Sequence, residues 1–222
     1  SAALVDGGAS GEIAFKGRIS DAAAAALIPA LDTGKVLRIT SQGGDESAAL
    51  ALADAILSKG IRVRVSKYCL SACANAVLPA AKAISVDADA VIGLHGSAFA
   101  IERNYVLLGE KPPEAIAELA AGYRTLYARA GASLDLLDCA AKAIELTTER
   151  VRVDQPNGAP RIGWKSRYEW WAPPTRDLAS FGLRLDAISL ARDDQVWRKV
   201  AEAGWSAQGA RARFEGVTSV CH

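Results

Sequence analysis

The predicted fold rests on the stretch Ile39-Thr40-Ser41-Gln42-Gly43-Gly44-Asp45 and on two stretches that follow it, Tyr68-Cys69-Leu70-Ser71-Ala72-Cys73-Ala74 and Leu94-His95-Gly96-Ser97. The first places a glycine pair directly after an apolar strand. The second places a serine where a strand meets a helix, and the third contains the only internal histidine. Their order along the chain suggests that the three stretches meet in space.

Strand and helix patterns alternate around these stretches. Apolar residues recur with the period of a strand or of a helix face, and capping residues mark several helix ends. The predicted strands cover residues 12–19, 35–40, 61–65, 84–86 and 90–95, and the predicted helices cover residues 21–31, 45–59 and 71–82. This order of repeated β-α-β units predicts an α/β fold with a mostly parallel sheet and right-handed crossovers.

The second half of the chain is predicted to be mostly helical. Helices are expected at residues 112–130, 133–148, 172–182 and 194–203, a strand at 183–190, and a loop at 154–163, where prolines and glycines gather. We expect residues 1–190 to form one domain, with residues 191–222 adding a C-terminal helix and tail.

The bulk composition is that of an ordinary globular protein. Half of the 222 residues are hydrophobic, 23% are charged, and the formal net charge is +1. This charge provides no basic face for nucleic acid, and no apolar run approaches the roughly 20 residues needed to span a bilayer. The chain contains no methionine, so we expect an N-terminus that was processed or trimmed, through removal of a signal peptide, loss of the initiator or cloning.

The three stretches contain the parts of a serine hydrolase. Gly43 and Gly44 leave backbone N–H groups unhindered, which suits an oxyanion or a phosphate, although a tight turn before a helix explains a glycine pair equally well. Ser71 at a helix start places its hydroxyl and the Ala72 N–H near the positive end of the helix dipole, or else it is an N-cap. If Ser71 has an imidazole base, His95 is nearly the only choice, because the other histidine is the last residue.

The order of these motifs resembles the Clp protease proteolytic subunit family, within the crotonase-like superfamily. Residues 39–45 are similar to that family's Ile-Asn-Ser-Pro-Gly-Gly-Ser segment, and residues 68–73 look like its nucleophile turn. Residues 92–95 look like its Met-Ile-His strand end, and residues 173–183 resemble its Ala-x-Glu-Ala-x-x-Tyr-Gly-Leu segment. The resemblance covers residues 12 to about 190, and the Cys-x-Ser-Ala-Cys form also resembles exported bacterial members of the superfamily.

The resemblance implies a catalytic arrangement but leaves one member open. It implies Ser71 as nucleophile, His95 as base, and an oxyanion hole from the amides of Gly43 or Gly44 and Ala72. The family's acidic third member does not carry over, because the comparable stretch Trp164–Trp171 has no carboxylate at the expected place. The candidates for this role are Glu169, Asp154 and Ser166, and a dyad without a carboxylate is the alternative.

The four cysteines allow three complete pairings. Cys69 and Cys73 bracket Ser71 and are spaced so that a disulfide could lock the nucleophile turn; otherwise they are two small apolar residues of a buried helix. Cys139 and Cys221 would then remain to tie the tail to the helix at 133–148. No CxxC pair supports a metal site, and we expect neither a metal nor a cofactor.

Other residues leave alternatives open. The aromatic residues Trp164, Tyr168, Trp170 and Trp171 either cap the core or form a substrate-binding wall. Lys67 and Lys82 suggest the serine–lysine dyad of signal peptide peptidase A, another relative of this fold, but they rank below His95.

The sequence therefore predicts a serine peptidase or related acyl hydrolase. The alternatives are a catalytically silent binding or assembly protein and a crotonase-type enzyme acting on coenzyme A thioesters. We expect a peptide or protein substrate, no nucleic acid and no ATPase partner, and the relatives imply a homo-oligomer. The even cysteine count favours a periplasmic or otherwise exported protein over a cytoplasmic one.

Overall fold

A six-stranded sheet organises the chain in the computed structural model, which describes residues 4–7, 11–155, 158–191, 202 and 211–221. The strands run in the order β1-β2-β3-β4-β5, and β6 also pairs with β4. All pairings are parallel except the antiparallel pair β1–β2. The bounds are β1 Leu4–Gly7, β2 Glu12–Lys16, β3 Val36–Ser41, β4 Arg62–Leu70, β5 Ile84–Val86 and β6 Val91–Gly93. The predicted α/β class with a mostly parallel sheet is confirmed.

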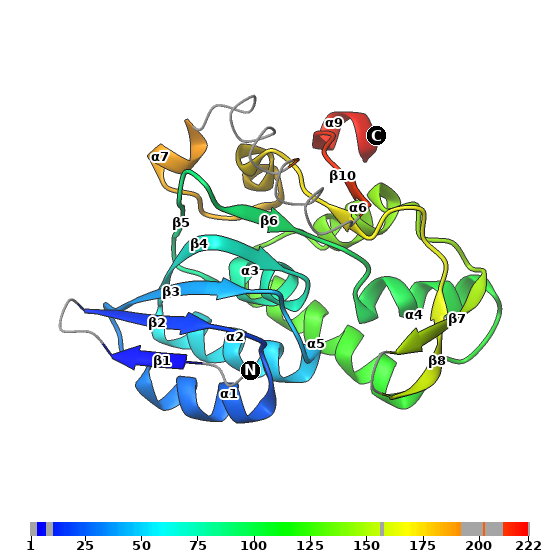
Figure 1. Ribbon diagram of the computed structural model, residues 1–222, viewed down its shortest axis with the longest axis horizontal. Helices are drawn as coiled ribbons and strands as arrows, with labels where there is room; N and C mark the ends of the chain where they lie inside the picture. The colour runs from blue at the N-terminus through cyan, green and yellow to red at the C-terminus, as the bar shows by residue number, and fades with distance from the viewer. Residues whose placement is uncertain (1–3, 8–10, 156–157, 192–201, 203–210, 222) are drawn as a thin grey trace.

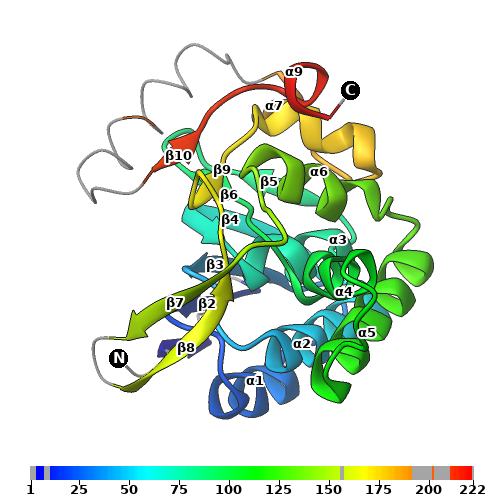
Figure 2. The same ribbon diagram turned by 90° about the vertical axis from the view of Figure 1, so that its right-hand side faces the viewer.

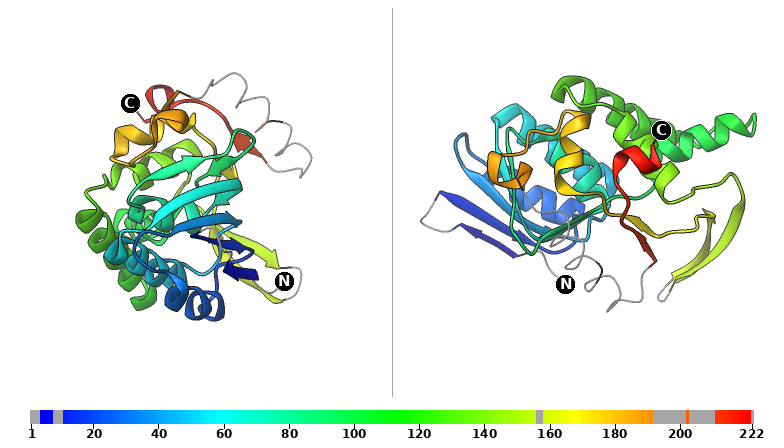
Figure 3. Two further views of the ribbon diagram at one scale, coloured as in Figure 1. Left: turned by 90° about the vertical axis from the view of Figure 1, so that its left-hand side faces the viewer. Right: turned by 90° about the horizontal axis from the view of Figure 1, so that it is seen from above.

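Helices α1, α2 and α5 lie together along one side of this sheet, as Figures 1 and 2 show. The view in Figure 3 (left) shows the sheet from the opposite direction, with the same helices beside it. The bounds are α1 Asp21–Leu27, α2 Glu46–Lys59, α3 Leu78–Ala80, α4 Ala98–Leu107, α5 Glu114–Ala130 and α6 Asp135–Ala143. A 3-10 turn η1 (Ile28–Ala30) extends α1, and a π-helical segment η2 (Cys73–Val77) precedes α3.

The sequence explains why these elements form where they do. In β2 the alternate residues Ile13 and Phe15 are buried, as the period of a half-buried strand requires. Helix α2 begins after Asp45, whose side chain accepts a hydrogen bond from the Ala48 N–H at 2.9 Å. It ends at Gly60, which adopts the left-handed conformation with φ +63°. The predicted helix over 45–59 is therefore confirmed at both ends.

The C-terminal third departs most from prediction. Its elements are β7 Arg150–Gln155, β8 Gly158–Trp164, β9 Trp170–Trp171, η3 Thr175–Phe181, α7 Ala187–Leu190, β10 Ala212–Arg213 and α9 Val217–Val220. Strands β7 and β8 form a separate antiparallel hairpin, which projects from the body in Figures 2 and 3. The predicted loop at 154–163 is thus wrong. An isolated two-stranded hairpin leaves one edge of each strand unpaired, so Pro160 is tolerated there.

Other expectations need smaller corrections. The predicted strand over 183–190 is wrong, because only Leu185 forms a bridge, to Ile84, and Asp186 then caps the short helix α7. The predicted helix over 133–148 ends earlier, and Glu145 beyond it has φ +52°. Helix α4 was not predicted. The predicted helix over 194–203 lies outside the described residues except for residue 202. No helix in the described part of the chain has the length and apolar character needed to cross a membrane.

Candidate active site

Ser71 and His95 are brought together by two paired strands. Ser71 directly follows β4 and His95 lies just beyond β6, and the two strands pair through Leu70 and Gly93. The Ser71 N–H donates to the Gly93 carbonyl at 2.9 Å. The Ser71 Oγ then lies 2.5 Å from the His95 Nε2. A serine hydroxyl within hydrogen-bond reach of an imidazole is the geometry that nucleophile activation requires.

The backbone at Ser71 is held in an uncommon conformation. Its φ is +57°, in the left-handed region that non-glycine residues rarely occupy. The chain turns there from β4 towards the π-helical segment η2, and the Asn75 N–H donates back to the Ser71 carbonyl at 2.8 Å. Such strained strand-to-helix turns expose a nucleophile, and strain and π-helical turns are both frequent at functional sites.

The two glycines of the first stretch have different neighbours. A Cβ at Gly43 (φ +85°) would lie 2.6 Å from the Ser71 Cβ and 2.9 Å from the Ala72 nitrogen. A Cβ at Gly44 would instead lie 2.0 Å from the Ile19 carbonyl oxygen. Gly43 therefore allows the loop to approach the nucleophile turn, whereas Gly44 allows it to pack against the segment after β2.

The backbone donors near Ser71 are not equivalent. The Gly43 N–H donates to the buried Ser41 Oγ at 3.1 Å, so it already has an acceptor. The Ala72 N–H belongs to the first turn of a helix, where amides have no intrahelical acceptor. Of the three predicted donors for a developing oxyanion, the Ala72 N–H is therefore better placed than that of Gly43, which becomes available once its amide turns away from Ser41.

Three residues, Trp170, Trp171 and Asn75, hold the segment that carries His95. The His95 ring packs edge to face against Trp170, with ring centroids 4.9 Å apart and an interplanar angle of 87°. Leu94 exchanges two backbone hydrogen bonds with Trp171, of 2.7 and 2.8 Å. The Asn75 side-chain amide also donates to the His95 carbonyl at 3.4 Å. The nucleophile helix and β9 thus both fix the position of the base.

The candidates for a third catalytic member lie in different places. Glu169 is 50% exposed at its side chain and faces Arg211, with 3.9 Å between Oε1 and Nε. Ser166 is half-buried in the loop after β8. Asp154 belongs to β7 of the projecting hairpin, and its side chain is outside what the structure describes. None of the interactions described for these three residues reaches His95.

Glu46 is an acidic residue near the site that the sequence analysis did not select. It is the first residue of α2, and its carboxylate accepts from the Ala98 N–H, with Oε2 at 3.1 Å and Oε1 at 3.3 Å. Burial raises the pKa of Glu46 to about 7, against the opposing effect of the hydrogen bond from the Ala98 N–H. A carboxylate that titrates near neutrality beside a candidate active site is a functional signal in itself.

A sequence signal existed for Asn75, the other residue that was missed. It is the only strongly polar side chain in an otherwise apolar helical stretch, Ala72–Ala81. It is fully buried, and its Oδ1 has no hydrogen-bond partner in the structure. For Glu46 no comparable signal existed, because an acidic residue in the first turn of a helix is an ordinary stabilising feature.

The four cysteines form two disulfides. Cys69 and Cys73 are paired with Cα atoms 5.4 Å apart, on either side of Ser71. Cys139 of α6 pairs with Cys221, with Cα atoms 5.1 Å apart, and so ties the end of the described chain to the body. Disulfides of this kind are typical of an oxidising compartment.

The alternatives left open by the sequence receive little support from these positions. Lys67 is exposed in β4, and Lys82 is exposed with its side chain near Gly60. Among the aromatic residues, Trp171 is fully buried and Trp164 packs against Tyr105. Of these four aromatic rings, the described ring contacts bring only that of Trp170 against His95.

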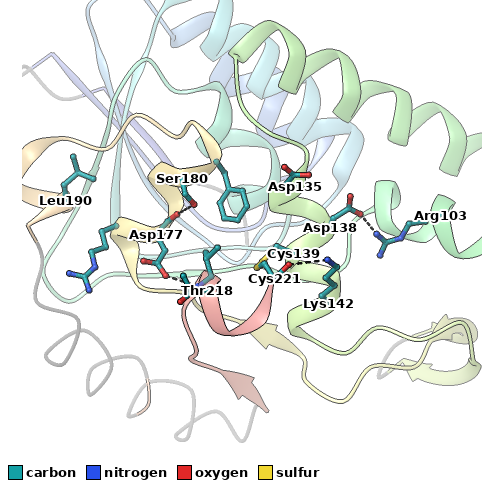
Figure 4. Close-up of a pocket in the computed structure, with 13 residues that line it drawn as sticks. Arg103, Asp135, Asp138, Cys139, Lys142, Asp177, Ser180, Leu190, Thr218 and Cys221 are labelled. Carbon is teal, nitrogen blue, oxygen red and sulfur yellow. Dashed lines mark hydrogen bonds and ion pairs between the residues drawn. A yellow bond between two sulfur atoms is a disulfide. The ribbon is translucent and has the colours of Figure 1, made fainter.

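A cavity of about 850 Å³ lies elsewhere, between α6, η3 and α9 (Figure 4), and neither Ser71 nor His95 lines it. Its charged groups have partners of their own: Asp138 pairs with Arg103, and Asp177 accepts the Val217 N–H at 2.9 Å. The Cys139–Cys221 disulfide forms part of its wall.

Comparison with other proteins does not add to this geometry. No protein-family model matches the chain. No curated protein matches it at a significant level. Among the described residues, no group of three or more histidine, cysteine or acidic side chains is arranged to hold a metal ion.

Proposed function

We propose that the protein is a serine acyl hydrolase with Ser71 as nucleophile and His95 as general base. The observation that carries the proposal is the 2.5 Å contact between the Ser71 Oγ and the His95 Nε2, made at a residue whose φ is +57°. An ordinary N-cap serine needs neither a left-handed backbone nor an imidazole partner.

The chemistry follows from this contact. Ser71 Oγ attacks the substrate carbonyl while His95 Nε2 takes the hydroxyl proton, and the carbonyl oxygen becomes an oxyanion near the Ala72 N–H. Collapse of the tetrahedral intermediate expels the leaving group, to which His95 returns the proton. Water, deprotonated by His95, then hydrolyses the acyl-enzyme and restores Ser71.

The substrate class and the family are part of the same proposal. The motifs at 39–45, 68–73 and 92–95 resemble the Clp protease proteolytic subunit family, and a mostly parallel sheet is compatible with that fold. On this basis the substrate is a peptide or protein. The two disulfides support a periplasmic or otherwise exported location. The exposed apolar residues Val106, Leu107 and Ile162 support self-association.

Labelling with a fluorophosphonate, followed by intact-mass analysis, tests the proposal. We expect one adduct on the wild type, and none on Ser71→Ala or His95→Ala. Labelling that survives in His95→Ala but not in Ser71→Ala would assign the base to another residue. No labelling of folded wild type, in oxidising and reducing buffer alike, would contradict hydrolase function.

A catalytically silent binding protein is the second candidate. It is favoured by the Glu169 carboxylate facing Arg211 and by the Gly43 N–H bonded to Ser41, because both groups are engaged away from the reacting atoms. The third candidate, an enzyme acting on coenzyme A thioesters, predicts retention on an immobilised thioester of coenzyme A, which the hydrolase does not require.

A further inference from the structure

Glu46 connects the two loops that form the candidate site. It directly follows the loop of Gly43, Gly44 and Asp45, and its carboxylate accepts the N–H of Ala98, the first residue of α4. Ala98 lies three residues after His95. The link between the glycine loop and the base is therefore one side chain and one short segment, His95–Ala98.

Other groups also hold this segment, and just before it Leu94 exchanges backbone hydrogen bonds of 2.7 and 2.8 Å with Trp171. Asn75 holds the His95 carbonyl, and Ser97 caps α4 by accepting from the Ala100 N–H at 3.5 Å. Both bonds lie at or beyond the upper end of normal hydrogen-bond lengths. The Glu46 bonds to Ala98, at 3.1 and 3.3 Å, are shorter than either.

We propose that Glu46 is a positioning residue for His95: by accepting the Ala98 N–H, its carboxylate holds the start of α4 and thereby keeps the imidazole in register with Ser71. This inference rests on the proposed hydrolase function and extends it to a residue that does not touch the reacting atoms. The hydrogen bond is strongest when the carboxylate is ionised, because a charged acceptor binds an amide more tightly than a neutral one.

The position of the His95 imidazole relative to Ser71 therefore depends on pH through the ionisation of Glu46. The charged and titratable groups that face it are Asp45 on the preceding turn and the Tyr123 hydroxyl from α5. Burial, which is the largest cause, and the Asp45 charge together raise the pKa of Glu46 to about 7. The carboxylate is therefore mostly neutral at pH 5 and mostly ionised at pH 8.5.

The test compares fluorophosphonate labelling rates of wild type and Glu46→Gln between pH 5 and pH 8.5. Glutamine keeps an acceptor for Ala98 but cannot ionise. We expect the two proteins to react equally at pH 5 and the wild type to react about tenfold faster at pH 8.5, with a midpoint near the Glu46 pKa of about 7. A purely structural role would give a ratio that does not change with pH.

Two further variants sharpen the result. Glu46→Asp retains an ionisable group, so its rate relative to Glu46→Gln must also rise with pH. Glu114→Gln removes an exposed carboxylate from the first position of α5 and must follow the wild type at every pH.

The Ala98 amide resonance gives a readout independent of activity, and we expect it to shift with a midpoint near pH 7 in the wild type and not in Glu46→Gln.

The outcomes separate this inference from the function on which it rests. A labelled wild type whose rate ratio to Glu46→Gln is constant with pH overturns the positioning role and leaves the hydrolase intact. An Ala98 amide that does not follow the Glu46 titration overturns it as well. A folded wild type that is unlabelled at every pH overturns both.

Discussion

Gly43 packs against the nucleophile turn with no room for a side chain, and this predicts a specific defect. A Cβ at this position would lie 2.6 Å from both the Ser71 Cβ and the Leu70 carbonyl oxygen. Gly43→Ala must therefore displace either the glycine loop or the serine. We expect the labelling rate to fall by about 100-fold, the usual effect of losing an oxyanion-hole donor, as measured by intact-mass time courses.

Gly34→Ala is the matched control for this substitution. Gly34 has nearly the same backbone conformation, with φ +90° against +85° at Gly43, but its Cβ would meet no atom within 4 Å. Both variants carry the strain of a left-handed alanine, about 1–2 kcal/mol. Only Gly43→Ala is expected to lose labelling, and equal labelling of the two variants would show that Gly43 has no part in the site.

Trp170 gives a second prediction at the scale of one residue. Its ring packs edge to face against His95, and aromatic pairs of this geometry contribute about 0.5–1.5 kcal/mol beyond burial. We expect Trp170→Ala to slow labelling up to about tenfold by loosening the imidazole, and Trp170→Phe to restore most of the rate. A rate for Trp170→Phe as low as that of Trp170→Ala would point to the indole nitrogen instead of the ring contact.

The sequence identified the residues of the site that are rare or unusually placed. Ser71 and His95 stood out because one lies at a strand-to-helix junction and the other is the only internal histidine, and the structure brings them together. Asn75 and Glu46 were missed, since their importance depends on hydrogen bonds to the His95 carbonyl and the Ala98 amide across the fold. For Glu46 this contact leaves no periodic or compositional trace, whereas Asn75 did leave one, as a lone strongly polar residue in an apolar helical stretch.

At the scale of elements, prediction succeeded where one hydrophobic period dominated. Strands β2 and β3 and helix α2 have clear patterns with capping residues at their ends. The β7–β8 hairpin was missed because its strands pair with each other and not with the main sheet, and because prolines and glycines gather in residues 154–163. The hairpin forms by pairing between two strands that are neighbours in the sequence, and the hydrophobic pattern of the sequence does not reveal such a pairing.

The Cys69–Cys73 disulfide spans the element that presents Ser71, and its predicted effect is local. The loop it closes is very short, so chain entropy contributes only about 2 kcal/mol to stability. Both cysteines are fully buried beside a serine with a left-handed backbone. We expect the double variant Cys69→Ala/Cys73→Ala to lower the labelling rate by about tenfold or more, because the strained turn can relax.

The Cys139–Cys221 pair provides the matched comparison for this element. It spans 82 residues, for which chain entropy predicts a contribution of about 4.5 kcal/mol. Removing it should lower the thermal midpoint more than removal of Cys69–Cys73 does, while the labelling rate stays unchanged. Equal effects of the two double variants on labelling would show that neither disulfide acts specifically on the turn. Intact-mass time courses measure the labelling rate, and calorimetry measures the thermal midpoint.

At the scale of the whole molecule, the carboxylate proposed to hold the base also makes stability depend on pH. The pKa of Glu46 is raised in the folded protein from 4.5 to about 7, so the folded state binds this proton more tightly than the unfolded state. Between these two values the free energy of unfolding therefore falls as pH rises, and the loss is complete above the folded pKa. One pKa unit corresponds to about 1.4 kcal/mol. Because solvent partly screens the Glu46 carboxylate, we expect the free energy of unfolding to fall by on the order of 2 kcal/mol.

Glu46→Gln removes this titration and with it the loss of stability at high pH. We expect the variant to match the wild type in thermal midpoint at pH 4.5 and to exceed it by several degrees at pH 8, as measured by calorimetry across that range. Glu114→Gln, at an exposed position, should show no such gap. A gap that is constant with pH would mean that Glu46 does not titrate in this window. A stabilised but slower Glu46→Gln at pH 8 would show that the fold gives up stability to keep an ionisable carboxylate behind its base, as active sites commonly do.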